Sequence, residues 1–453
     1  MTQPTSLPPH IQQSQTEHQI PGTCIGILHN NQTIIFPIGI TSIENPLDVT
    51  EDTLFQIGSN TKTMTATVLM MLAEEGKLDL DAPIRSVLPE FCVQDEMVSA
   101  TATIRQLVTH STGWVGDHFI DTGPGADAKA KYVESMVELP QLVPPDFAFS
   151  YNNSSFAVAG RVIEVVTGQL YEDAMQELLF EPLGMESTFF DMADVMVRRF
   201  VVGHSILPDE PVKVATPWPL SRAMYAAGAV TSTAGDMLTY ARFYLDRGKT
   251  ATGEQLLSES AMEAMWAPQF DTGSSRGAVA YSWFVQEEGG FNSYSHGGAT
   301  VGQMSAFKIV PEKNFAFVSL TNGSSGGLFN QEVEAWLLEE FCQIKPSEPE
   351  TYDPGTDTVA ELVGRYVRPM ADFVLSAEDG QLMGQIIAKQ GFPTKEVPPR
   401  PPTPLFRIAI IGADTLIALD EPAKGANFQI LRTEDGKIGW IRAGMRLHQR
   451  ESG

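Results

Sequence analysis

The chain has 453 residues, of which 56 are acidic and 30 basic, so its formal net charge at pH 7 is −26. Such a charge repels phosphate groups and argues against nucleic acid or an anionic membrane as a partner. With 43% hydrophobic and 19% charged residues, the composition excludes a disordered chain and fits a folded protein of two or three domains.

Three scattered cysteines, Cys24, Cys92 and Cys342, are too few for a disulfide framework or a structural zinc site, so we expect buried free thiols. Residues 1–20 have no basic start and no apolar core, unlike a secretory signal. No run of about 18 apolar residues occurs in the sequence. We therefore expect a cytoplasmic protein, in which the polar, proline-bearing residues 1–20 form a flexible tail.

The first predicted elements are two strands and one long helix. Thr23–His29 and Thr33–Ile40 are strand-like runs that flank Asn30-Asn31-Gln32, a pattern typical of a hairpin. Ser59–Glu75 contains helix formers and is closed by Gly76. Beyond its first turn this segment is apolar on nearly every side, which predicts a buried helix rather than a surface one.

Helical signals dominate from about Thr103 to Leu245, and strand signals return after them. Together with the long helix before it, this region is expected to form a helical lobe over about residues 63–245. The expected elements are helices Ser154–Thr167, Tyr171–Glu181 and Asp236–Leu245, strands Val279–Gln286, Ser293–His296, Gln303–Val310 and Asn314–Thr321, and a helix from about Asn330 to Cys342. This order predicts an α+β fold, in which an antiparallel β-sheet is flanked by helices and carries an inserted all-helical lobe. We assign residues 21–344 to this domain.

A second, smaller domain is expected at the C-terminus. Residues 345–358 hold three prolines and almost no apolar side chains, which is typical of a linker. Seven short strand-like pieces follow: Gly364–Arg368, Phe373–Ala377, Leu382–Ile387, Phe406–Ile411, Leu416–Leu419, Phe428–Arg432 and Gly439–Arg442. Their spacing fits a small β-barrel or sandwich, and we expect residues 359–453 to form an antiparallel barrel.

Ser59 and Lys62 form the first candidate catalytic cluster. At the start of a helix, side chains three positions apart share a face, so this hydroxyl and this amine can meet. Ser305 and Lys308 have the same spacing, but they lie in a predicted strand, where an offset of three places side chains on opposite faces.

The position of Ser59 favours nucleophilic chemistry. Free N–H groups and the positive end of the helix dipole can stabilise an oxyanion there. Desolvation of Lys62 in an apolar helix would lower its pKa, so that a neutral amine could take the proton of Ser59. The structural alternative is that Ser59 is a helix cap and that Lys62 reaches solvent.

Two further clusters carry possible site residues. Tyr151 precedes a predicted helix, and a phenol near a lysine can relay protons, while the amide of Asn153 can hold a substrate carbonyl. His296-Gly297-Gly298-Ala299 lies between two predicted strands, where glycines permit close approach and the Ala299 N–H can donate to an oxyanion. Taken alone, a helix cap at Asn153 and a plain turn at the second cluster are the structural alternatives.

Together the three clusters resemble the serine β-lactamases, the penicillin-binding proteins and their esterase and D-aminopeptidase-like relatives, whose motifs are S-x-x-K, Y-x-N and a Lys/His-x-Gly triplet. The resemblance covers about residues 20–343, and the C-terminal domain resembles the lipocalin-like domain of some peptidases of this group. It implies these roles: Ser59 as nucleophile, Lys62 as base, Tyr151 as proton relay, Asn153, His296, Gly297 and Gly298 as substrate contacts, and the N–H groups of Ser59 and Ala299 as oxyanion hole.

One departure concerns the third motif. Penicillin-handling members usually have Lys-Thr-Gly, whereas this chain has His296-Gly297-Gly298 and lacks the fixed positive charge and the hydroxyl that meet a substrate carboxylate. The resemblance therefore implies, as the first choice, a peptidase or amidase that forms an acyl-enzyme and tolerates D-residues. A carboxylesterase is the second choice and a weak β-lactamase the third. A catalytically inactive binding relative is the non-enzyme alternative. The C-terminal domain is expected to roof the cleft and to limit substrate size.

A rival hydrolase motif is weaker. Gly323-Ser324-Ser325-Gly326-Gly327 matches the G-x-S-x-G of α/β-hydrolases, but the only later histidine, His448, lies in the predicted barrel. The eight histidines show no metal-ligand spacing and no phosphate-binding loop occurs, so we expect no cofactor and no metal. The expected partner is a small molecule or short peptide, and homo-oligomer formation is left open.

Overall fold

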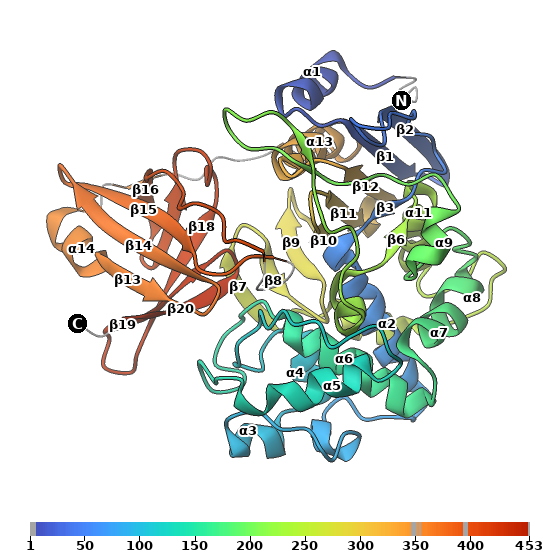
Figure 1. The fold of residues 1–453 in the computed structure, drawn as a ribbon, viewed down its shortest axis with the longest axis horizontal. Coiled ribbons are helices and arrows are strands. Elements are labelled where there is room, and N and C mark those ends of the chain that lie inside the picture. The colour runs from blue at the N-terminus through green and yellow to red at the C-terminus, as the bar shows by residue number, and fades with distance from the viewer. Residues whose placement is uncertain (1–5, 346–350, 353–354, 393–396, 452–453) are drawn as a thin grey trace.

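The computed structural model describes residues 6–345, 351–352, 355–392 and 397–451. It contains an α+β domain, in which helix α2 (Thr61–Glu74) runs between a β-sheet and a group of helices, and a β-barrel beside that domain (Figure 1). The predicted fold class, an antiparallel sheet with helices and a helical lobe plus a small C-terminal barrel, is confirmed.

The large sheet has eight strands, and neighbouring strands pair antiparallel. In spatial order they are β2 (Gln32–Gly39), β1 (Gly22–His29), β12 (Phe315–Thr321), β11 (Met304–Val310), β10 (Phe291–Ala299), β9 (Phe284–Glu288), β8 (Gly277–Val279) and β7 (Phe270–Ser274). One predicted strand, residues 279–286, is broken in two. The chain turns between β8 and β9, where the Ala280 N–H donates to the Trp283 carbonyl oxygen.

The middle strands of the sheet are buried on both faces. Along β1, the neighbours Cys24 and Ile25 belong to cores on opposite sides of the sheet, as the two-residue period of a strand requires. Helix α11 (Ala234–Leu245) covers the first side and helix α13 (Gly326–Leu337) the second. The sheet is therefore the middle layer of three.

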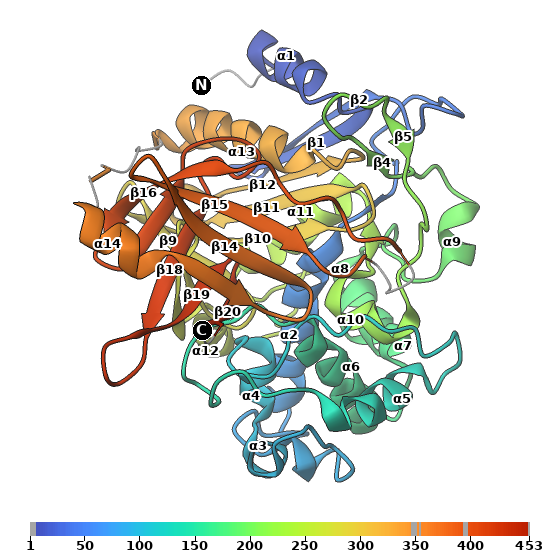
Figure 2. The same cartoon turned by 60° about the vertical axis from the view of Figure 1, so that its left-hand side comes forward.

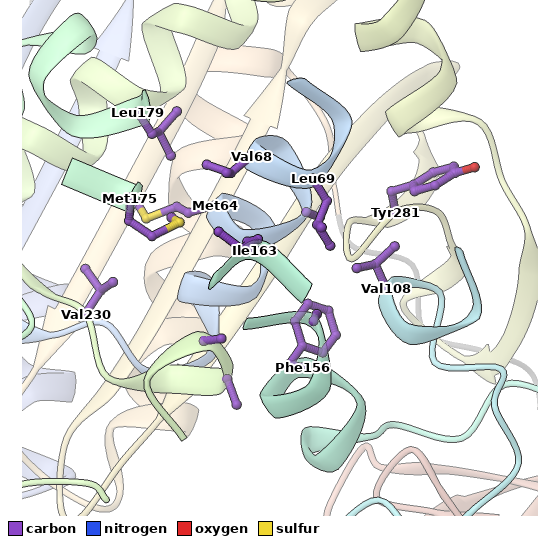
Figure 3. Packing of buried hydrophobic residues seen from close by; sticks show 14 of the residues in the cluster. Met64, Val68, Leu69, Val108, Phe156, Ile163, Met175, Leu179, Val230 and Tyr281 are labelled. Carbon is purple, nitrogen blue, oxygen red and sulfur yellow. The ribbon is translucent and has the colours of Figure 1, made fainter. Parts of the chain in front are cut away.

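The helical lobe surrounds α2. Its elements are β3 (Phe55–Gln56), α3 (Glu96–Thr101), α4 (Ile104–Val108), α5 (Ala128–Glu134), α6 (Asn153–Thr167), α7 (Tyr171–Met175), α8 (Glu181–Leu183), α9 (Met192–Met196), α10 (Tyr225–Gly228) and β6 (Thr231–Ser232), and α12 (Glu259–Trp266) follows α11. The short strand pair β4 (His204–Ser205) and β5 (Lys213–Val214) lies instead beside the end of β12, where His204 bridges to Gly323. Every residue of α2 from Thr61 to Leu72 is buried, which confirms the predicted burial of this helix. In Figure 3, Met64 and Leu69 of α2 lie among apolar side chains of the lobe such as Phe156.

The N-terminal segment differs from the sequence prediction. Residues 1–20 are predicted to be a flexible tail, whereas residues 9–17 form helix α1 (Pro9–Glu17) beside α13 (Figure 1). Leu7, Ile11 and Ile20 are buried in the same core as α13. These few apolar side chains pack against α13, so the helix is packed on the domain although most of its residues are polar.

Eight antiparallel strands close the C-terminal barrel, which lies in front in Figure 2. They are β13 (Gly364–Val367), β14 (Ala371–Glu378), β15 (Gln381–Ala388), β16 (Phe406–Gly412), β17 (Thr415–Ala418), β18 (Asn427–Arg432), β19 (Ile438–Ala443) and β20 (Arg446–Arg450). The sequence predicts the first seven. It misses β20, because only Leu447 of its five residues is apolar. The interior is filled by apolar side chains, among them the stacked rings of Phe373 and Phe428.

The predicted linker is only partly described. Helix α14 (Gly355–Leu362) begins inside it, and Tyr352 pairs with Ile410 of the barrel. Residues 346–350 and 353–354 of the predicted linker lie outside the described residues.

Candidate active site

Ser59 lies at the start of α2. It belongs to a 3₁₀ turn, Gly58–Asn60, that leads into α2, whereas the sequence predicts it within the α-helix itself. Lys62 is in the first turn of α2, and its Nζ lies 3.0 Å from Ser59 Oγ. The structure thus brings the hydroxyl and the amine of the first motif to hydrogen-bond distance.

Lys62 is fully buried, with an exposed fraction of 0%. Its Nζ donates a hydrogen bond to the Ala227 carbonyl oxygen in α10 and stands 5.0 Å from the centre of the Tyr151 ring. Desolvation and the positive charge of Arg446 hold the pKa of Lys62 well below its usual value, although Asp117 opposes them. The alternative in which Lys62 reaches solvent is therefore excluded, and a neutral amine here can accept the Ser59 proton.

Tyr151 lies beside this pair. Its backbone N–H donates to the Met445 carbonyl oxygen at 2.8 Å, and its ring stacks on His110, with ring centres 4.4 Å apart. Burial raises the pKa of Tyr151 to about 12, although a side-chain hydrogen bond with Ser59 offsets part of the rise. At neutral pH this side chain is a phenol, which can donate one proton while it accepts another.

Two glycines let the nucleophile turn and β10 approach each other. A Cβ atom on Gly298 would lie 1.9 Å from the Ile57 carbonyl oxygen, and one on Gly58 would lie 2.6 Å from the Ala299 nitrogen. Gly58 also has φ +54°, a conformation that favours glycine. The backbone segments that carry the Ser59 and Ala299 N–H groups are therefore in direct contact.

The third motif lies within a strand, not between two strands as the sequence predicts. The pairing of β9 with β10 ends at Ser295, whereas β11 continues to pair through the glycines to Ala299. On the β9 side, residues 296–299 thus have no strand partner among the described residues. Desolvation and the nearby Lys62 lower the pKa of His296 to about 3, so its ring carries no charge at neutral pH.

Two residues that the sequence analysis did not assign to the site hold the nucleophile turn against β11. The Ser305 hydroxyl donates to the Ile57 carbonyl oxygen at 2.8 Å and accepts from Asn60 Nδ2 at 2.7 Å. Ser305 is the serine of the second S-x-x-K match. It supports the turn that carries Ser59, through its hydrogen bonds with Ile57 and Asn60.

Asn153 is linked to the barrel through a carboxylate. It is the first residue of α6, whose cap is Asn152, and its Nδ2 donates to Asp117 Oδ1 at 2.8 Å. The same carboxylate accepts from Arg368 at 2.7 Å and from Arg446 at 2.9 Å. Burial alone would raise the pKa of Asp117, but the two arginines hold it well below its usual value.

A cavity of about 1070 Å³ extends from Ser59. Tyr151 and Asn153 line it from the α+β domain, and Met445 and Arg446 line it from the barrel. These two barrel residues lie at the turn between β19 and β20, which enters the site. The sequence gives no local signal for this contact, because it joins segments that are about 300 residues apart.

The rival G-x-S-x-G motif is not a nucleophile elbow. It lies between β12 and α13, beside an antiparallel sheet, whereas the elbow of α/β-hydrolases requires a parallel one. The Ser325 hydroxyl donates to the His18 carbonyl oxygen at 2.6 Å. The motif therefore serves to connect the sheet with the N-terminal segment.

The described residues offer neither a metal-ligand cluster nor a helix that could span a membrane. In this part of the chain, no group of three or more His, Cys, Asp and Glu side chains is placed to hold a metal ion. Among the same residues, no helix combines the length and the apolar character that crossing a bilayer requires.

Comparison with known proteins places this geometry in a family. The family model described as Beta-lactamase matches residues 8–339. Penicillin-binding protein 4 of Amycolatopsis lactamdurans is 34% identical over 368 residues, which cover 78% of this chain and 95% of that protein.

Solved structures share the fold. The crystal structure of SurE matches with a TM-score of 0.74 at 24% identity, over 97% of both chains. The D-amino acid amidase from Ochrobactrum anthropi SV3, complexed with D-phenylalanine, matches with a TM-score of 0.59 at 22% identity, over 72% of this chain and 96% of that one. By its family model and its relative from Amycolatopsis, the chain belongs to the beta-lactamase family and is a serine hydrolase.

Proposed function

We propose that the enzyme hydrolyses amide bonds in short peptides or amino acid amides, with tolerance of D-residues, through an acyl-enzyme on Ser59. The observation that carries this proposal is the state of Lys62. Its amine is fully buried and lies 3.0 Å from the Ser59 hydroxyl, and in the described part of the chain no carboxylate forms an ion pair with it.

Acylation begins at this pair. As Ser59 Oγ forms a bond to the substrate carbonyl carbon, its proton moves to the neutral Lys62 amine, and the carbonyl electron pair becomes an oxyanion. The carbonyl oxygen of Ala227 accepts a hydrogen bond from the new ammonium group. The N–H groups of Ser59 and Ala299 are the expected oxyanion donors, because their backbones are in contact.

Tyr151 completes the proton transfer. Its phenol donates a proton to the leaving nitrogen and recovers one from the Lys62 ammonium, so the C–N bond breaks and a neutral amine leaves. Deacylation follows the same route in reverse, with water as the nucleophile. The acid is then released and the Ser59 hydroxyl is restored. A pKa of about 12 keeps Tyr151 in the phenol form that this relay needs.

The substrate class rests on the third motif and on two relatives. A neutral His296 and the glycine after it offer neither a fixed charge nor a hydroxyl to a β-lactam carboxylate, which favours an amidase over a β-lactamase. One solved relative is a D-amino acid amidase, and another, SurE, is also solved with D-Leu. Control of substrate size by the barrel and homo-oligomer formation stay predictions.

The test compares Ser59→Ala with Ser325→Ala, the serine of the rival motif. With p-nitrophenyl acetate, the wild type and Ser325→Ala should release about one equivalent of p-nitrophenol in a burst, and Ser59→Ala should release none. With phenylalanine p-nitroanilides, the D-enantiomer should react faster than the L-enantiomer, and both should react faster than nitrocefin. A full burst from Ser59→Ala would refute the nucleophile, whereas a preference for nitrocefin would refute only the substrate class.

A further inference from the structure

Arg446 brings the barrel into the active site. It is the first residue of β20, and its Nε and Nη2 donate to Asp117 Oδ2 and Oδ1 at 2.9 and 3.2 Å. Its guanidinium carbon stands 4.8 Å from the centre of the Tyr151 ring. The carbonyl oxygen of the preceding residue, Met445, accepts the Tyr151 N–H. One turn of the barrel therefore contacts both Tyr151, the proposed proton relay, and the buried carboxylate of Asp117.

The Asp117 carboxylate, which binds Arg446, also accepts a hydrogen bond from Asn153. Because Asn153 Nδ2 donates to Asp117 Oδ1, the amide is oriented with its nitrogen towards the carboxylate. Its oxygen is then the end left to accept an N–H group from a substrate in the cavity. Arg446 binds both oxygens of Asp117 and Arg368 binds one of them, so Arg446 helps to fix the carboxylate that orients the Asn153 amide.

Arg446 also acts on the charge of the Lys62 amine. The Arg446 guanidinium and the Lys62 amine lie 4.8 and 5.0 Å from the centre of the same Tyr151 ring, so about 10 Å at most separates them. A like charge at this range disfavours the ammonium form. Asp117 acts in the opposite direction.

The other titratable side chains around Lys62 carry little charge. Tyr151 is a phenol, and burial lowers the pKa values of both His110 and His296 well below the ordinary value of a histidine. Arg276 lies near enough to influence the pKa values of Tyr151 and His296. The charge balance at the amine is therefore set mainly by Arg446 against Asp117.

We propose that Arg446 is a positioning residue of the active site: it fixes Asn153 through Asp117, supports Tyr151 and places a permanent positive charge beside the Lys62 amine. The proposal rests on the acyl-enzyme function proposed above. It assigns the barrel a part in acylation itself, in addition to covering the cleft.

The experiment measures the rate of the p-nitrophenyl acetate burst against pH. Arg446→Gln should raise the pKa of Lys62, so the acid limb of the profile should move to higher pH by about one unit. Asp117→Asn removes the opposing charge and should move the limb to lower pH. Arg446→Lys keeps the charge but loses the paired hydrogen bonds, so it should leave the limb in place and lower kcat/KM for D-phenylalanine p-nitroanilide about tenfold.

Arg442→Gln is the matched control. Arg442 lies on the adjacent strand β19, is buried, and donates to the Phe149 carbonyl oxygen across the same interface, but it contacts neither Tyr151 nor Asp117. Its loss should lower the melting temperature without moving the acid limb.

Two results would overturn the proposal. One is an acid limb that stays at the wild-type pH in a folded Arg446→Gln protein, and the other is an upward shift in Asp117→Asn. If Arg446→Gln does not fold, the Asp117→Asn and Arg446→Lys profiles decide. A wild-type protein without a burst would instead refute the acyl-enzyme function, and this inference with it.

Discussion

Two serine–lysine pairs of identical spacing lie close together in this molecule and differ in their surroundings. Ser59 and Lys62 are at the start of α2, and Ser305 and Lys308 are on β11. Both lysines are buried, with exposed fractions of 0% and 2%. Their comparison shows which features make a buried lysine a proton acceptor.

The first difference is the presence of acid partners. Lys308 forms ion pairs with Glu288 and Glu334 at 2.7 and 2.6 Å. Burial alone would lower the pKa of Lys308, but Glu334 and Glu288 reverse the effect and raise it. Lys62 makes its two described hydrogen bonds with a carbonyl oxygen and the Ser59 hydroxyl instead of with carboxylates, and its pKa falls. Carboxylates therefore decide whether a buried lysine stays a cation.

The second difference is secondary structure. In the first helical turn, an offset of three brings Lys62 to Ser59. In the strand, the same offset sends Ser305 towards the nucleophile turn and Lys308 towards Glu334 on α13. In this molecule the S-x-x-K pattern therefore brings the hydroxyl and the amine together at the helix start and separates them in the strand.

The largest effect expected from this comparison is on turnover. Lys62→Met should lower kcat by about 10⁴-fold, because no other neutral amine among the described residues is placed to take the Ser59 proton. Lys308→Met, the same change at the other pair, should leave kcat within about twofold. The measurement is steady-state hydrolysis of the best p-nitroanilide substrate by both folded variants. Equal losses of kcat in the two variants would show that Lys62 is not a proton acceptor with a role that Lys308 lacks.

A smaller effect is expected on stability, with opposite signs. The raised pKa of Lys308 stabilises the fold at neutral pH, and this contribution is lost only as the pH rises through its folded pKa, above 10.5. Lys308→Met should therefore lower the free energy of unfolding at pH 7 by about 3–5 kcal/mol, because it leaves two carboxylates without their buried partner. The lowered pKa of Lys62 means that the unfolded chain binds the extra proton below pH 10.5, which destabilises the fold.

Lys62→Met should remove this penalty and raise the free energy of unfolding at pH 7 by about 1–3 kcal/mol. The gain should shrink as the pH rises towards 10.5. Urea denaturation of the wild type and both variants at pH 7 and pH 10 checks these signs. A destabilised Lys62→Met protein at pH 7 would argue that Lys62 is charged in the folded state.

The sequence predicts the local part of the site well. The apolar character of residues 59–75 correctly predicts a buried helix, and the helix start brings Ser59 to Lys62. The glycines of the third motif correctly indicate close backbone approach, here between Gly298 and Ile57. These features depend on neighbours within one turn or on the steric needs of glycine.

The sequence does not predict the contacts between distant segments. Asp117 and Arg446 are 329 positions apart, and nothing in either segment alone marks them as partners. The same holds for Ser305, whose hydroxyl supports a turn 248 positions earlier. Helix α1 escapes prediction for a related reason, because Ile11 gains its apolar contacts only from the core around α13.

The charge state of Lys62 is the central claim, and a direct titration tests it. The ¹³Cε signals of lysines in labelled protein can be followed from pH 6 to 11, with Lys62→Met identifying the signal of Lys62. The account predicts that this signal titrates well below 10.5 while that of Lys308 does not. If the ¹³Cε chemical shift of Lys62 in the folded enzyme keeps its protonated value up to pH 10.5, the amine is a cation at neutral pH and the central claim is wrong.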